Sequence, residues 1–215
     1  MIDGSINPEK NELQFALGNR LCVDFANLAL SPGDEADHAP SWDELMDFFA
    51  AKQIVSLEKS ETLRNLPQSD VHAAAALLRS SVDLNRGLRQ IFRAMANGHR
   101  VARDWTEPIN RVLRITEGHD ELKWDGKSWR LAFVGREEGL DWLLAAIARS
   151  GAELIAEGPN HNLRRCGNPR CPVLFYDSSA THRRRWCSMA LCGNRSKVAA
   201  FARRHIREQA RAHHA

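Results

Sequence analysis

The stretches RCGNPRC (residues 165–171) and CSMALCGNR (residues 187–195) decide how the last quarter of this chain folds. They place four cysteines in two close pairs, separated by a 15-residue insert: Cys166, Cys171, Cys187 and Cys192. Four thiolates arranged in this way can complete a tetrahedral all-sulfur site of the kind that zinc prefers. Turn-forming residues fill the first pair, which suits a loop that points both sulfurs toward one metal ion. The stretches therefore predict a metal-stabilised module.

The residues between and after the cysteines predict the order of elements in this module. Residues 173–176 are expected to form a strand, 177–181 a turn, and 184–186 the returning strand of a hairpin. Ser188 is placed to cap a helix that carries Cys192. The predicted order of knuckle, hairpin and helix is that of a treble clef.

A metal ion is also required on energetic grounds. A segment of about 55 residues with few large apolar side chains cannot bury enough surface to fold alone, and metal binding contributes on the order of 10 kcal/mol to such modules. One structural zinc per chain is therefore the expected cofactor, because closed sites of four thiolates are not catalytic. Two disulfides, an iron–sulfur cluster and four unrelated cysteines are the alternatives. Nearby histidines are expected to contact phosphate or solvent: His161, His182 and His205.

The residues directly after Cys192 allow several readings. A glycine at 193 permits close backbone approach to the metal, and Asn194 would cap or tie the knuckle. Arg195 would brace the hairpin or meet a phosphate. These readings of Gly193, Asn194 and Arg195 stay open at the level of sequence.

Charge is distributed unevenly along the chain, although its net value is only +3. Residues 161–215 contain 12 Lys/Arg against 2 Asp/Glu, whereas residues 1–160 contain 18 against 25. This asymmetry is typical of a polyanion-binding module fused to a different body. On a helical wheel, one face after Cys192 is cationic: Lys197, Arg203, Arg204, Arg207 and Arg211. The opposite face is largely apolar and is expected to pack on the hairpin: Val198, Phe201, Ala202, His205, Ile206 and Gln209.

We expect the cationic face to bind nucleic acid mainly through backbone phosphates, because like charges on one face repel unless a polyanion offsets them. The hairpin would add secondary contacts from Arg183, Arg184 and Arg185. DNA is the expected partner. RNA bound by the same surface, or a protein-interaction module with a purely structural zinc, are the alternatives. Exposed aromatic side chains would favour RNA, but their places around the hairpin favour the module's core: Phe175, Tyr176 and Trp186.

Residues 1–158 are expected to form a mainly helical domain with a small hairpin, and residues 161–215 the module, which makes the fold class α+β. The break lies at Gly158-Pro159-Asn160. Ser41 is expected to cap a helix, and Asp125-Gly126 predicts a hairpin over residues 122–133. Further helices are expected over 19–30, 67–100, 105–116 and 137–157. The inward face of the longest is predicted to contain Val71, Ala75, Leu78, Val82, Ile91 and Met95.

The sequence contains no recognisable catalytic motif, so the chain is not expected to be an enzyme. Cys22 is expected to be a buried small apolar residue, and Asp24 with Asn27 to form a satisfied structural network or to line a pocket. The first residues are polar and no apolar run has the ~18 residues of a membrane span. A cytoplasmic protein with no membrane contact is therefore expected, in a compartment where clustered cysteines bind metals.

Together these motifs resemble the bacterial CGNR zinc-finger family. The resemblance rests on residues 164–166, 174–177, 185–188 and 192–195, and on LCVDFAN at 21–27, which resembles the opening motif of the ABATE domain that precedes the finger in that family. That domain is described as a putative stress-induced transcription regulator. The resemblance implies that the four cysteines bind zinc and that the finger binds DNA. An unidentified small-molecule ligand of the amino-terminal domain and a homodimer are further partners that this architecture leaves open.

Overall fold

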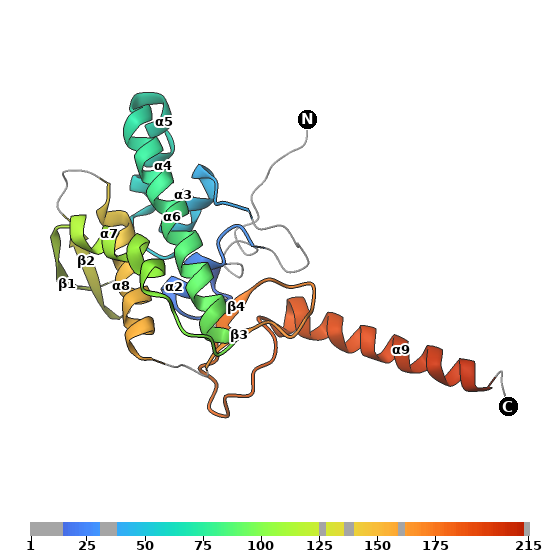
Figure 1. The fold of residues 1–215 in the computed structure, drawn as a ribbon. Coiled ribbons are helices and arrows are strands. Elements are labelled where there is room, and N and C mark those ends of the chain that lie inside the picture. The colour runs from blue at the N-terminus through green and yellow to red at the C-terminus, as the bar shows by residue number, and fades with distance from the viewer. Residues whose placement is uncertain (1–14, 31–37, 125–127, 136–139, 159–161, 213–215) are drawn as a thin grey trace, which may run out of the picture.

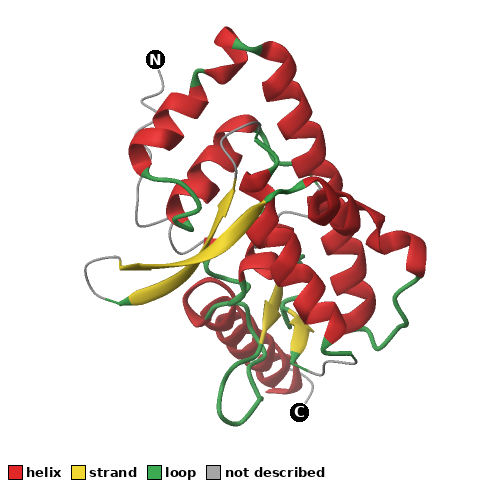
Figure 2. Cartoon of the chain, turned by 90° about the vertical axis from the view of Figure 1, so that its left-hand side faces the viewer, coloured by secondary structure: helices red, strands yellow, loops and turns green. Residues whose placement is uncertain are grey.

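The computed structural model describes residues 15–30, 38–124, 128–135, 140–158 and 162–212. Its elements are α2 (Leu21–Ala26), α3 (Trp42–Ala51), α4 (Leu57–Arg64), α5 (Leu66–Ser69), α6 (Val71–Ala96), α7 (Glu107–Ile115), β1 (Gly118–Trp124), β2 (Trp129–Gly135), α8 (Trp142–Ala156), β3 (Leu163–Arg165), β4 (Leu174–Tyr176) and α9 (Asn194–Ala212). A helical body carries the antiparallel hairpin β1–β2 at one side and the small hairpin β3–β4 at the base of α9 (Figures 1 and 2). The predicted α+β class is therefore confirmed. None of the described helices combines the length and the apolarity that a bilayer crossing requires.

Local sequence signals place several of these elements correctly. The Ser41 hydroxyl accepts a hydrogen bond from the Glu44 amide, and the Glu44 carboxylate accepts one from the Ser41 amide at 2.8 Å, which completes the predicted capping box of α3. The strands β1 and β2 pair from Gly118 with Gly135 to Trp124 with Trp129. The Asp-Gly turn between them lies outside the described residues. The hairpin prediction is confirmed by its strands.

The inward face of α6 is rotated from the predicted one. Of the predicted set only Ile91 is buried, and Val71 is 62% exposed. The buried set is Ala74, Leu77, Ser81, Leu84, Asn85, Gly87, Leu88, Arg89, Ile91, Phe92 and Ala94. It includes polar residues because α6 covers the backbone of α2 as well as apolar side chains. Asn85 donates to the Phe25 carbonyl at 2.6 Å, and Arg89 donates to the Ala26 carbonyl at 2.9 Å.

Helix α2 lies at the centre of the body, packed against both α6 and α8 (Figure 1). Its Cys22 is fully buried, as predicted. The Asp24 carboxylate accepts a hydrogen bond from the Gly18 amide at 2.7 Å and forms an ion pair with Lys52 at 2.6 Å. Burial raises the pKa of Asp24, and the Lys52 ammonium opposes that rise. Asp24 therefore belongs to a satisfied structural network, which is the reading that the sequence favours.

The body and the cysteine module share a continuous interface. The Asn27 side chain holds both backbone groups of Leu174 in β4: its amide donates to the carbonyl at 2.7 Å, and its oxygen accepts from the N–H at 2.9 Å. Leu163 and Leu174 pack into the core of the body, while Leu17 packs among the cysteines. The module is thus anchored on the carboxyl end of α2 by buried polar and apolar contacts together.

Candidate metal centre and nucleic-acid interface

The four cysteines come together at the base of α9. Cys166 follows β3, Cys171 precedes β4, and Cys192 lies on a single π-helical turn, Met189–Gly193, that leads into α9. All four side chains are buried, and their sulfur atoms lie within 4.8 Å of one another. The four cysteines predicted as metal ligands therefore lie together at one site.

The spacing of these sulfurs fits one tetrahedral metal ion. The sulfur of Cys187 lies 3.8 Å from that of Cys171 and 3.7 Å from that of Cys192. A zinc ion with Zn–S bonds of about 2.3 Å holds its sulfur ligands about 3.8 Å apart in a tetrahedron. A disulfide would require about 2.05 Å between sulfurs, and all four thiols are free. The disulfide alternative is therefore wrong.

The thiols also perturb one another in a way that favours a cation. Hydrogen bonds from the Cys171 and Cys187 thiols lower the pKa of Cys166 to about 2. The same contacts with Cys166 raise the pKa of Cys171 to about 12 and raise that of Cys187 as well. The Cys166 thiol thus ionises readily, whereas Cys171 and Cys187, with raised pKa values, lose their protons when a bound cation replaces them.

The first knuckle is the turn that joins β3 to β4, and this corrects the predicted pairing of strands. β3 pairs with β4 in the register Leu163 to Tyr176 and Arg165 to Leu174, whereas residues 184–186, the predicted partner, form no strand. The physical reason is Asp177, which is fully buried directly after β4. Its carboxylate accepts a hydrogen bond from the Arg184 amide at 2.9 Å, and this contact holds residues 184–186 in a loop.

Arg184 has a structural role in this loop. Its guanidinium donates to the carbonyls of Trp186, at 2.9 Å, and of Leu17 and Cys187, and it lies 4.5 Å above the Phe175 ring. The side chain thereby connects the body, the hairpin and the second cysteine pair. Its neighbours Arg183 and Arg185 are exposed, so the cationic surface of the loop consists of these two.

Gly193 gives room to side chains of the module. A Cβ at this position would lie 2.5 Å from the Met189 sulfur and 3.1 Å from the Trp186 ring. The Gly193 amide donates to the Ser188 carbonyl at 3.0 Å, and the Ser188 hydroxyl accepts from the Leu191 amide, as its predicted capping role requires. Asn194 begins α9 with its side chain exposed.

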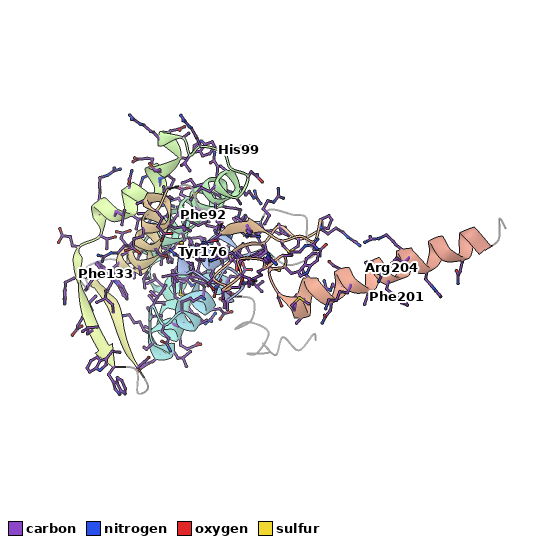
Figure 3. All side chains as sticks on the ribbon, turned by 90° about the horizontal axis from the view of Figure 1, so that it is seen from below. Phe92, His99, Phe133, Tyr176, Phe201 and Arg204 are labelled. Carbon is purple, nitrogen blue, oxygen red and sulfur yellow. The ribbon has the colours of Figure 1, made fainter. Side chains whose placement is uncertain are left out.

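Helix α9 projects away from the body, which overturns the prediction that its apolar face packs on the hairpin (Figures 1 and 3). Val198 is 69% exposed and Phe201 is 64% exposed. The reason is length: a helix of 19 residues is about 28 Å long, whereas strands of three residues span only about 10 Å. The start of α9 contacts the π-helical turn Met189–Gly193 that precedes it.

The predicted contact residues gather on this projecting helix and on the loop. Lys197, Arg203 and Arg204 are exposed, as is Arg195 at the start of α9. The side chains of Arg207 and Arg211, and His161, lie outside the described residues. The sequence reasoning missed two exposed cations here, Arg165 at the end of β3 and Arg170 in the first knuckle. They stand beside metal ligands, which is the signal that could have revealed them.

Three aromatic residues around the hairpin, Phe175, Tyr176 and Trp186, are buried or half-buried. Phe175 is fully buried, and Trp186 and Tyr176 are half-buried against the two cores. The Arg20 guanidinium of the body covers the Tyr176 ring of the module at 4.2 Å. The prediction that these aromatics form the finger's core is confirmed for Phe175, against which Trp186 packs, whereas Tyr176 packs against the core of the body.

Two family models match the chain. Residues 162–205 match the CGNR zinc finger, and residues 19–158 match the ABATE family, described as "Putative stress-induced transcription regulator". The second match spans more than half of the chain. The chain belongs to the ABATE family. No curated protein matches it. In this ABATE chain the motif LCVDFAN is structural: Asp24 holds the turn before α2, and Asn27 holds the CGNR finger.

Proposed function

We propose that this ABATE–CGNR chain is a transcription regulator whose finger binds one structural zinc and binds duplex DNA mainly through backbone phosphates. The observation that carries the proposal is α9, a cationic helix that stands clear of the body at the metal centre. With side chains an α-helix is about 10–12 Å wide, which matches the ~12 Å width of the major groove of B-DNA.

The distribution of exposed side chains on α9 supports a partner that surrounds the helix. Lys197, Arg203 and Arg204 are exposed, and so are Val198 and Phe201 on the other side. Cationic side chains can contact the phosphates that flank a groove, while apolar side chains can contact thymine methyl groups on its floor. Arg183 and Arg185 of the loop would add phosphate contacts near the start of the helix.

Zinc is proposed as the metal because four buried cysteine sulfurs at tetrahedral spacing are the donors it prefers in structural sites. Such a site is closed, so the metal has no open position for a substrate; this supports a protein without catalytic activity. Duplex DNA is favoured over single-stranded RNA because Phe175 is buried and Tyr176 and Trp186 are half-buried in packing, which leaves Phe201 as the exposed aromatic ring of the finger, fewer than a stacking surface for successive bases uses.

A zinc test comes first. Metal analysis of the purified chain is expected to give one zinc per chain, and a strong chelator should remove hydrogen-exchange protection from residues 163–193. Metal binding of this kind contributes on the order of 10 kcal/mol, more than so small a core can replace. A finger that keeps its protection after complete metal removal would exclude a structural metal.

A salt titration tests DNA binding. Fluorescence anisotropy of duplex DNA, single-stranded DNA and structured RNA should show preference for the duplex, with a log–log salt slope of roughly −0.9 per phosphate contact. The variant Arg203→Gln/Arg204→Gln should reduce the slope by about two units if each arginine meets one phosphate. The matched control Arg79→Gln/Arg100→Gln removes the same charge from exposed sites on the body.

The outcomes separate the alternatives. Equal loss of affinity in both double variants would show that net charge alone drives binding and would overturn the role of α9. Preference for RNA would favour the RNA-binding alternative. Absence of binding at low salt by the zinc-loaded chain would leave the finger as a protein-interaction module.

A further inference from the structure

A second cationic feature lies in the body, away from the metal centre. The described residues around a cavity of about 380 Å³ beside α6 are His38, Arg86, Arg89, Gln90 and Arg93. This volume lies within the range of small-molecule sites, about 300–1,000 Å³. The four α6 residues face the same cavity because positions 86, 89, 90 and 93 fall on one side of a helix.

The three arginines differ in what they do. Arg89 is 3% exposed, and its guanidinium donates to the carbonyls of Ala26, at 2.9 Å, and Leu28, at 3.0 Å. It is therefore fixed in the wall as a positive charge. Arg93 is half-buried and Arg86 is exposed, so both lie nearer to solvent than Arg89.

The cavity is electrostatically suited to an anion. Burial lowers the pKa of Arg89 to about 10, with a further contribution from the charge of Arg93, and burial lowers the pKa of Arg93 too. Guanidinium groups that crowd one another in a desolvated place are stabilised by a bound negative charge. About 10 Å of helix axis separates Arg86 from Arg93, a span that two arginine side chains can close around one oxyanion group.

We propose that this cavity binds a small ligand through an oxyanion, a phosphate or a carboxylate, held by Arg86 and Arg93 over the fixed charge of Arg89. Planar guanidinium groups bind such oxyanions through paired hydrogen bonds. Gln90 and His38 line the same cavity and bring further side-chain hydrogen-bonding groups to it. The inference does not depend on DNA binding by the finger.

The site is connected to the finger by buried hydrogen bonds. Arg89 holds the carbonyls of Ala26 and Leu28, the two residues on either side of Asn27. Asn27 in turn holds Leu174 of β4 through both of its backbone groups. A ligand that interacts with the charge of Arg89 therefore acts on residues 26–28, the segment that anchors the finger. We expect occupation of the cavity to change hydrogen exchange at β4.

Calorimetric titration of the zinc-loaded full chain tests the site, at constant ionic strength, with inorganic phosphate, methyl phosphate and acetate as separate probes. Saturable binding of at least one probe is expected. The variant Arg86→Gln/Arg93→Gln should weaken it by at least about tenfold, since it removes the charged donors of the site. The control Arg79→Gln/Arg100→Gln, with the same change of charge, should bind as the unmodified chain does.

Comparison of the probes distinguishes a phosphate ligand from a carboxylate ligand. Absence of saturable binding for all three probes would overturn the proposal, and so would binding that the Arg86→Gln/Arg93→Gln variant leaves intact. If that variant binds duplex DNA more weakly while the unmodified chain binds no small probe, the cavity is part of a DNA-contacting surface, and the small-ligand site is wrong. Unchanged exchange at Leu174 on saturation would refute the connection to the finger.

Discussion

The substitution Asn27→Ala tests how the finger is held on the body. Asn27 is 3% exposed and Leu174 is fully buried, so water cannot replace the two hydrogen bonds of 2.7 and 2.9 Å that would be lost. Each backbone group of Leu174 left without a partner costs about 1–3 kcal/mol. The expected loss is therefore about 2–6 kcal/mol, a large fraction of the ~5–15 kcal/mol that stabilises a typical domain.

Urea unfolding of the zinc-loaded chain, followed by tryptophan fluorescence, measures this loss. With a slope of about 2 kcal/mol per molar urea, the midpoint should fall by about 1–3 M. The control Asn110→Ala removes an exposed asparagine whose side chain donates to Thr106, and it should change stability by less than about 0.5 kcal/mol. Hydrogen exchange at Leu174 should rise only in the first variant. Equal midpoints for the two variants would refute the anchoring role of Asn27.

Three further predictions concern the finger. Arg184→Met keeps an apolar side chain over Phe175 but removes the hydrogen bonds to three carbonyls. It should lower the free energy of unfolding in urea by about 2–4 kcal/mol, whereas the control Arg183→Met should lower it by less than about 0.5 kcal/mol. Similar losses in the two variants would contradict the structural role of Arg184. Phe201→Ser should leave the urea midpoint unchanged within about 0.5 kcal/mol, because Phe201 is 64% exposed; a loss above about 1 kcal/mol would show that α9 packs on the finger in solution. Burial alone would raise the pKa of Asp177, but hydrogen bonds from Ser179 and the Arg184 amide hold it below its ordinary value. A carboxylate with a lowered folded pKa contributes stability above its unfolded pKa and loses it as pH falls through the folded one. The difference in urea midpoint between the unmodified chain and Asp177→Asn should therefore shrink below about pH 4; a difference that stays constant from pH 7 to pH 3 would contradict this.

The metal site could be predicted because its information is local. Each cysteine pair lies within one turn of chain, and thiols have few other uses when four of them cluster. The hairpin partner could not be predicted in the same way. Residues 163–165 follow a helix end and look like a linker, whereas Arg184-Arg185-Trp186 looks like a strand. The outcome depends on Asp177, whose buried carboxylate takes the Arg184 amide, and no pattern in the sequence states that contact.

Two other differences have a common cause. Hydrophobic periodicity treats Asn85 and Arg89 as surface residues, yet both are buried because the carbonyls of α2 need donors. The apolar stripe assigned to α6 is rotated as a result. In α9 the periodicity is present, but a two-sided helix does not reveal whether its apolar side meets the same chain or a partner. Hydrophobic periodicity shows which side of a helix is apolar, but it does not show what packs against that side.

The carboxyl end of α2 is where the body, the cavity and the finger meet. A helix of six residues is too short to be stable alone, and α2 is buried where water cannot satisfy its last carbonyls. Asn85 and Arg89 of α6 donate hydrogen bonds to those carbonyls. Asn27, at the same end of α2, is hydrogen-bonded to the backbone of Leu174. The Cys166 amide donates to the carbonyl of Val173, the residue before Leu174, at 3.0 Å, so hydrogen bonds joined by short stretches of backbone connect the cavity wall to one of the four cysteines. The ligand proposed beside Arg89 would therefore act on the backbone that holds Leu174 and Cys166.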